Sequence, residues 1–188
     1  MCSAANVQRV ATYNFNSADV TTSGLDVQAS YETNVGPGLV QAGVAGSHVI
    51  EYQVGDVIVE GISVQPAYDA AGKLNYQTTA YPIPRWKGQA WLQGEFGPHL
   101  LRVQANHVGG YTDQRAIFAT LLAGQAIASY TTVDATWRWS LHTGTTVALS
   151  LFNIFDQAPP FARLDQNYDP FTADPLGFTA KLGVSQAF

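Results

Sequence analysis

The 188 residues suffice for one sizeable domain, but only 12% of them are charged, against about 25% in an ordinary soluble domain. The formal charge of −5 argues against nucleic-acid binding, because the chain has no basic stripe that would neutralise phosphates. Cys2 is the only cysteine, which excludes an intrachain disulfide, and no apolar run approaches the roughly 20 residues of a membrane helix.

Alternation of apolar and polar residues, which is typical of β-strands, recurs along the chain, whereas the apolar spacing of helices is scarce. The first stretch, 7–15, is irregular and gives a doubtful strand. Seven further stretches alternate clearly and are expected to form strands: 23–32, 39–52, 85–96, 100–111, 130–141, 145–155 and 178–188. Because tight turns join several of them, we expect an all-β antiparallel meander.

Each predicted strand has one apolar and one polar face, since successive side chains point to opposite sides. Leu92 is expected on the apolar face of its strand and Gln93 on the polar face. In the same way, Leu149 is expected on the apolar face and Ser150 on the polar one.

The predicted connections alternate between short and long. Short turns are expected at 33–38, 97–99 and 142–144, and long loops at 53–83, 112–128 and 156–175. Outer-membrane barrels have this alternation, because their short turns face the periplasm and their long loops face the outside. Strands of about 12 residues, tilted by about 45°, cover roughly 28 Å, enough for an apolar band of about 25 Å.

Aromatic residues gather near the two ends of the predicted strands. Such residues settle at membrane interfaces, because they combine an apolar ring with, in Tyr and Trp, a polar edge. Two girdles are therefore expected, although aromatic enrichment is also a general property of strands. The short-turn girdle comprises Tyr31, Phe96, Trp139 and Phe188, and the long-loop girdle comprises Tyr52, Trp86 and Tyr111.

Several short motifs occur in a distinctive order. They are "TTSGLDVQASYE" at 21–32, "NIFD" at 153–156, "YDP" at 168–170 and "PLG" at 175–177. In this order and spacing, the chain resembles the C-terminal part of the β-barrel of TonB-dependent outer-membrane receptors.

The resemblance implies that residues 1–188 form the last seven or eight strands of a barrel of about 22 strands. The plug, the TonB box and the earlier strands would then lie in a missing N-terminal region, through which the TonB complex acts. The implied function is energy-coupled uptake of a scarce nutrient, such as a ferric siderophore, cobalamin or a glycan. The implied partners are outer-membrane lipid and the barrel-assembly machinery, and ligand contacts are expected in the loops 53–83 and 112–128.

The C-terminus also resembles the outer-membrane targeting signal of such barrels. Lys181, Gly183 and Phe188 match its polar, glycine and terminal aromatic positions. Gln186 departs from the pattern, because an apolar residue usually stands there. At the interface the cost of this amide is small compared with burial in mid-membrane.

Polar and aromatic residues on the inward faces would line the lumen of such a barrel. Plug packing and cross-strand pairing are the preferred interpretation, ahead of direct ligand contact. The expected lumen-lining residues are Arg85, Lys87, Trp91, Arg102, Asp134 and Arg138.

Neither a metal site nor catalysis is predicted. The four histidines His48, His99, His107 and His142 lack metal-ligand spacing. The stretch 165–176 begins like a calcium loop, but it has Pro170 at the sixth position and Leu176 at the twelfth. No nucleophile elbow, phosphate loop or catalytic carboxylate pair is present, so neither enzymatic activity nor a cofactor is expected.

Two alternatives remain open at this point. The first is a self-contained eight-stranded outer-membrane barrel with a structural or adhesive role, closed by the stretch 7–15. Arg9 interrupts one face of that stretch, and a narrow lumen would hold so many large inward groups with difficulty. The second is a soluble β-sandwich that acts as a binding module.

Overall fold

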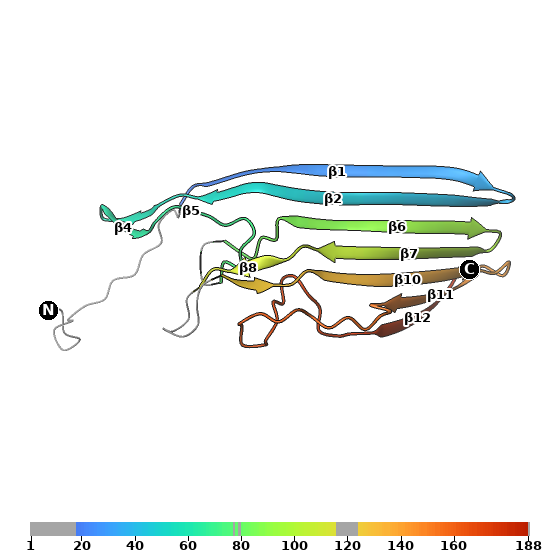
Figure 1. Cartoon of the computed structure of the whole chain (residues 1–188). Helices are drawn as coiled ribbons and strands as arrows, with labels where there is room; N and C mark the ends of the chain where they lie inside the picture. The colour runs from blue at the N-terminus through green and yellow to red at the C-terminus, as the bar shows by residue number, and fades with distance from the viewer. Residues whose placement is uncertain (1–17, 77, 79, 116–123, 188) are drawn as a thin grey trace.

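The computed structural model describes residues 18–76, 78, 80–115 and 124–187, and these residues form strands, turns and loops. Seven long strands build one antiparallel sheet in strict chain order (Figure 1). They are β1 (Val20–Val35), β2 (Gly38–Val54), β6 (Trp86–Phe96), β7 (His99–Val108), β10 (Tyr130–Ser140), β11 (Thr145–Phe152) and β12 (Thr179–Gln186). The predicted all-β antiparallel meander is confirmed, whereas the doubtful stretch 7–15 lies outside the described residues.

Within the described residues, no helix has the length and hydropathy needed to cross a membrane.

Five short strands lie in the long connections. The strands β3 (Val57–Val59) and β4 (Ile62–Gln65) form one small hairpin, and β8 (Tyr111–Asp113) and β9 (Gln125–Ile127) form another. The strand β5 (Tyr68–Asp69) pairs with the end of β2. In Figure 1 these elements gather at one end of the sheet, which we call the loop end.

Short turns occupy the opposite end, here called the turn end. The turn after β1 contains Gly36 at φ 57°, the turn after β6 contains Gly97 at φ 56°, and the turn after β10 contains Gly144 at φ 79°. A positive φ favours glycine, because a side chain would clash with the backbone in that conformation. The predicted alternation of short turns and long loops is confirmed.

The strand register continues the apolar face across the sheet. Leu92 on β6 is in register with Ala42 on β2 and Val103 on β7. Leu149 on β11 is in register with Trp137 on β10 and Leu182 on β12. Residues in register on adjacent strands point to the same side, so the apolar residues of neighbouring strands share one face.

The other face is polar by the same criterion. Gln93 is in register with Gln41 and Arg102, and Ser150 is in register with Thr136 and Lys181. The predicted opposition of Leu149 and Ser150 agrees with this register.

The sheet is a single layer. Every residue of β1 is exposed, and large apolar side chains elsewhere on the apolar face are exposed too, such as Leu92 at 55% and Leu182 at 70%. A β-sandwich requires a second sheet packed on the first. Among the described residues the remaining sheets are the small hairpins at the loop end, so the predicted sandwich alternative lacks its second layer.

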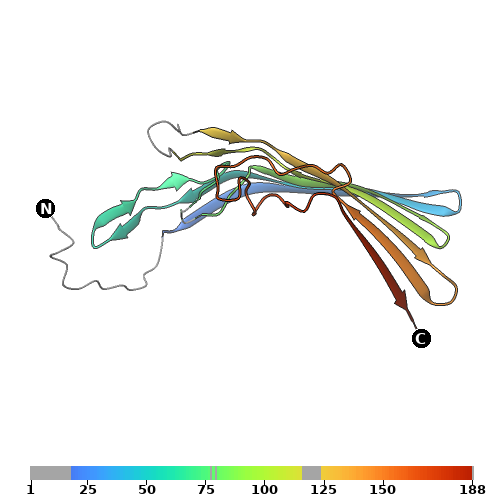
Figure 2. The same cartoon turned by 90° about the horizontal axis from the view of Figure 1, so that it is seen from below.

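The buried core lies at the loop end and not beneath the strands. One cluster consists of Leu74, Tyr111, Ile127 and Ala162. A second cluster consists of Val54, Ala70 and Ala80. Figure 2 shows the strands fanning apart toward the turn end, with β1 and β12 on opposite edges.

Three predicted strands end earlier in the structure. The strand β7 ends at Val108, because Gly109 and Gly110 break the alternation before Tyr111. The strand β11 ends at Phe152, because Asn153 adopts a positive φ of 48°. The strand β12 ends at Gln186, and Phe188 lies outside the described residues.

Candidate functional site

The polar face carries rows of hydrogen bonds that run across the strands. Gln104 Nε2 donates to Gln89 Oε1 at 3.1 Å and to Asn106 Oδ1 at 2.7 Å. Asn106 Nδ2 in turn donates to Asp134 Oδ2 at 2.9 Å. This row joins β6, β7 and β10, so the polar side chains satisfy one another on a face that no second sheet covers in the described part of the chain.

A second row lies nearer the turn end. Gln93 Nε2 donates to Gln41 Oε1 at 3.1 Å and to Glu95 Oε1 at 3.0 Å. Gln41 Nε2 donates to a carboxylate oxygen of Glu32. The row extends from β1 to β6.

Two residues expected in the lumen lie together between these rows. The Arg102 guanidinium lies 4.4 Å from the centre of the Trp91 ring, in cation–π geometry. Trp91 packs over Gly43, where a Cβ atom would lie 2.6 Å from the indole. Glycine at this position lets the indole lie flat on the polar face.

Asp134 connects the polar face to the connection after β11. Its Oδ1 accepts a hydrogen bond from the Asn153 backbone N–H at 2.9 Å. Asn153 begins the "NIFD" motif, and its side chain exchanges two hydrogen bonds with the Gln157 backbone, at 2.9 and 3.0 Å. Asp134 therefore positions the turn at which the chain leaves β11.

The "NIFD" and "PLG" motifs meet in space. Asp156 Oδ1 accepts a hydrogen bond from the Phe178 backbone N–H at 2.9 Å. Gly177 adopts φ 63°, and a Cβ atom there would lie only 2.5 Å from Asp156 Oδ1. These motif residues thus close the long connection between β11 and β12.

Three other residues expected in the lumen have different surroundings. Lys87 and Arg138 are exposed on the polar face. Arg85 precedes β6 at the loop end, where its guanidinium lies 3.0 Å from an Asp69 carboxylate oxygen. It also donates to the carbonyl oxygen of Val49 at 3.2 Å, so it ties the β5 segment to β2.

The environment of Asp69 is consistent with this tie. Burial acts to raise the pKa of Asp69, but hydrogen bonds from the backbone N–H groups of Ala71 and Tyr52, together with the Arg85 charge, lower it overall. Asp69 is therefore held as a carboxylate that organises the loop end.

An ion-pair cluster joins two long loops. Asp113 is 1% exposed and accepts hydrogen bonds at 2.9 Å from both Arg115 and Arg163. Each arginine also donates to the backbone carbonyl of the other, at 2.7 and 2.9 Å. Burial acts to raise the pKa of Asp113, but the hydrogen bonds from the arginines lower it overall.

The structure corrects the expected place of Tyr111. The residue is 5% exposed, and its hydroxyl donates to an Asp169 carboxylate oxygen and lies 2.8 Å from Thr172 Oγ1. Burial, together with the Asp169 carboxylate, raises the pKa of Tyr111 well above its usual range. Because Gly109 and Gly110 redirect the chain, Tyr111 enters the loop core instead of an interfacial girdle.

Replacing Tyr111 with Phe is expected to loosen the contact between the β8 hairpin and the loop at 169–172. The substitution leaves a buried carboxylate without its hydroxyl donor, at a cost of about 1–3 kcal/mol. Hydrogen exchange of the loop amides should show faster exchange there and unchanged exchange in β6 and β7. Unchanged loop exchange would contradict the assigned role of the hydroxyl.

The remaining predicted aromatic residues lie at both ends of the sheet. Tyr31, Trp86 and Phe96 are exposed, whereas Tyr52 is half-buried and packs on the second loop cluster. The Trp139 ring is half-buried and stacks with Trp137 at a centroid distance of 6.2 Å.

The four histidines occupy unrelated positions. His48 lies against Trp86 with a centroid distance of 4.1 Å, and His99 lies within 6 Å of two tryptophan rings. His107 Nδ1 lies 2.8 Å from Thr131 Oγ1, and His142 is exposed in a turn. Across residues 18–76, 78, 80–115 and 124–187, no group of three or more His, Cys, Asp or Glu side chains has metal-binding geometry.

At the C-terminal end, Lys181 and Gly183 lie on the polar face, in register with Ser150 and Ala148. The unusual Gln186 makes local hydrogen bonds. Its Nε2 donates to the Thr143 carbonyl at 2.8 Å, and its Oε1 accepts from the Thr145 hydroxyl. Gln186 thus closes the turn between β10 and β11, which satisfies its amide.

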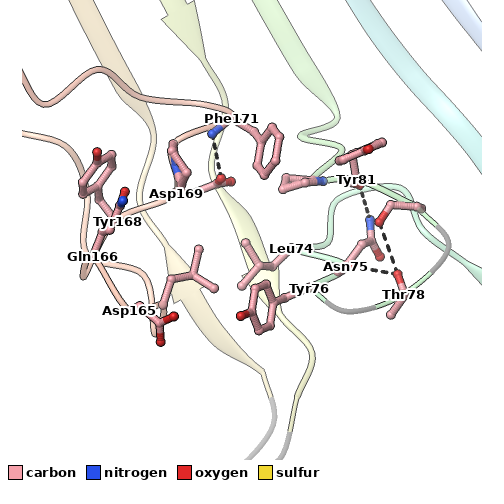
Figure 3. Close-up of a pocket in the computed structure, with 14 residues that line it drawn as sticks. Leu74, Asn75, Tyr76, Thr78, Tyr81, Asp165, Gln166, Tyr168, Asp169 and Phe171 are labelled. Atoms are coloured by element: carbon pink, nitrogen blue, oxygen red, sulfur yellow. Dashed lines mark hydrogen bonds between the residues drawn. The ribbon is translucent and has the colours of Figure 1, made fainter.

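A pocket of about 280 Å³ opens between two loop segments at the loop end. Figure 3 shows Asn75, Tyr76, Thr78 and Tyr81 on one side, and Asp165, Gln166 and Tyr168 on the other. Tyr81 and Phe171 meet across it with a centroid distance of 5.3 Å. We call this cavity the loop pocket.

Sequence reasoning located only part of the loop pocket. The lining residues 74–76, 78 and 80–82 lie in the loop 53–83, where the sequence predicts ligand contacts, whereas most of the opposite wall lies in the stretch 165–176, whose only predicted likeness is to the start of a calcium loop. Both loops are enriched in aromatic residues, and this enrichment is the one feature of the sequence that points to the pocket. It does not predict that the two loops contact each other. The other loop expected to contact ligand, 112–128, is described only in part, since residues 116–123 are not described.

A comparison with protein-family models, with curated proteins and with solved structures finds no match to this chain.

Proposed function

We propose that this chain forms part of the wall of an outer-membrane β-barrel of the TonB-dependent receptor type. The observation that carries the proposal is a single-layer antiparallel sheet with one exposed apolar face and one hydrogen-bonded polar face. Such a sheet is unfavourable in water, because large contiguous apolar surfaces are rarely left exposed there.

A membrane setting accounts for both faces. Lipid would cover the apolar face, which carries Leu92, Leu101 and Leu182. The polar face, with its rows around Gln104 and Gln93, would face a lumen or a plug. Pairing between strands satisfies backbone groups that would be costly if left unpaired in lipid.

The two ends of the sheet support an orientation. Barrels of this type have short turns in the periplasm and long loops outside. The turn end, with Gly36, Gly97 and Gly144, would then be periplasmic, and the loop pocket would be external. Lys181 and Gly183, the described part of the targeting signal, lie on β12 at its polar face.

The open edges favour a wide barrel over a self-contained small one. In the described part of the chain, β1 and β12 each pair on one side only. Unpaired strand edges are unfavourable in lipid, so further strands would close the barrel. The function that fits is energy-coupled uptake of a scarce nutrient, with transport and not catalysis as the activity.

The gene upstream of the codon for Met1 provides the test. We expect an open reading frame that encodes further strands with apolar–polar alternation and, before them, a plug with a TonB-binding segment. A complete signal peptide directly before Met1 would overturn the receptor and favour the eight-stranded barrel.

A further inference from the structure

We propose that the loop pocket binds a small organic cation that carries N–H donors. One wall comes from residues 74–76, 78 and 80–82 and the other from residues 164–166 and 168–171, which are far apart in the sequence (Figure 3). At about 280 Å³ the cavity lies at the lower end of the range of about 300–1,000 Å³ for small-molecule sites. It therefore suits a ligand about the size of one ring with a short substituent.

Four aromatic rings contribute to the lining. The faces of aromatic rings are electron-rich, so they attract cations that lie over them. Tyr76 illustrates this, because the Arg115 guanidinium already lies 4.6 Å from the centre of its ring. The aromatic lining residues are Tyr76, Tyr81, Tyr168 and Phe171.

The charge of the lining has one sign. Asp165 and Asp169 line the pocket, and none of its described lining residues is Lys, Arg or His. Asp169 is occupied by Tyr111 and by the Phe171 backbone N–H, at 3.0 Å for the latter. Asp165 is exposed at the pocket wall, where its carboxylate would attract a cation.

Asn75 holds the backbone of one pocket wall in place. Asn75 is 1% exposed, and the two hydrogens of its Nδ2 are shared among the carbonyl oxygens of Ala70, Lys73 and Tyr81, at 2.9, 3.1 and 2.9 Å. These bonds fix the orientation of the amide. Its Oδ1 is buried and has no hydrogen-bond partner within the described structure. Because Asn75 is almost fully buried, a ligand in the open cavity does not reach this oxygen, and its N–H groups would instead pair with the exposed Asp165 carboxylate.

This proposal does not depend on the sheet being in a membrane. Arg115 and Arg163 share the single carboxylate of Asp113, which leaves one net positive charge, and the two carboxylates of Asp165 and Asp169 in the pocket lining outnumber it. A protonated amine on an apolar ring meets both features of the pocket: the aromatic rings and the exposed Asp165 carboxylate.

Four probes of similar size test the proposal by calorimetry and saturation-transfer NMR, with the protein as its gene encodes it, purified in detergent. Benzylamine carries a positive charge and N–H donors, benzyltrimethylammonium carries the charge alone, benzyl alcohol is neutral, and benzoate is an anion. We expect benzylamine to bind most tightly, benzyltrimethylammonium more weakly, and the other two not measurably. Absent benzylamine binding, or equal binding of benzyl alcohol or benzoate, would overturn the cation assignment.

Two substitutions locate the binding site. Tyr81→Ala and Asp165→Asn change exposed side chains, so the loop core should remain folded. Each is expected to weaken benzylamine binding about fivefold, the effect of a cation–π contact or an exposed charge. Tyr31→Ala is the matched control, because Tyr31 is 70% exposed, close to the 72% of Tyr81, but lies at the turn end. Equal effects of Tyr31→Ala and Tyr81→Ala would place binding elsewhere and overturn the proposal.

Discussion

Replacing Leu149 with Arg should strongly impair assembly of the proposed barrel, whereas the neighbouring Ser150→Arg should be tolerated. Leu149 lies on the apolar face, between Trp137 and Leu182 in register, and Ser150 lies on the polar face. An arginine that faces lipid near the middle of the membrane costs about 2–4 kcal/mol, whereas one that faces a lumen does not. Such a loss is a large share of the roughly 5–15 kcal/mol that stabilises a typical protein.

The measurement is the amount of each variant in the outer-membrane fraction and its unfolding midpoint in urea. Ser150 is in register with Lys181, so an arginine at position 150 meets a like charge. The variants Leu149→Glu and Ser150→Glu therefore serve as a second comparison. Leu149→Glu should again be the more damaging of the two. Equal effects at both positions would mean that lipid does not cover the apolar face.

Removing the carboxylate of Asp113 should have the largest effect at the loop end. In Asp113→Ala the two arginines that share this buried carboxylate lose their counter-charge. Breaking a buried pair by removing one partner costs about 3–5 kcal/mol, because a charge is left unpaired. The loop core should therefore open while the long strands stay paired.

Limited proteolysis and hydrogen exchange would detect this opening. We expect rapid cleavage near Arg115 and Arg163 in Asp113→Ala, with slow exchange retained in β6 and β7. Asp26→Ala is the control, because Asp26 is an exposed carboxylate on β1. If the loops of Asp113→Ala resist proteolysis and hydrogen exchange as well as the loops of Asp26→Ala do, the ion pairs of Asp113 do not hold the loops together.

The same carboxylate predicts a pH dependence. The pKa of Asp113 is lowered in the folded protein, so its contribution to loop stability is fully present above the unfolded value of about 3.9. This contribution should be lost as the pH falls from about 4 through the lower folded pKa. Loop protection measured between pH 7 and pH 2 should fall in that acidic range, and Asp113→Ala should lack this component.

Alternation along the chain predicted the sheet and its two faces. A strand repeats every two residues, so Leu92 and Gln93, or Leu149 and Ser150, are assigned to opposite faces without knowledge of their partners. Glycines in short turns, such as Gly36 and Gly97, marked the turn end, because positive φ values favour them. These features depend on neighbouring residues alone.

Strand ends and loop contacts were beyond such reasoning. Tyr111 continues the apparent alternation of its strand, yet the two preceding glycines redirect it into the loop core. Arg85 also continues an alternating pattern, but it lies just before β6 and binds Asp69. Local periodicity does not report where a strand stops.

By itself, then, the sequence determined an antiparallel meander with one apolar face, one polar face, a turn end and a loop end. Only the tertiary structure decided which loop residues meet. Tyr111 bonds a residue 58 positions away, and Asp113 bonds an arginine 50 positions away. Contacts between irregular loops have no repeating pattern in the sequence, because their geometry depends on how separate connections pack at one end of the sheet. The loop pocket, with its rings and its unpaired Asn75 oxygen, results from that packing.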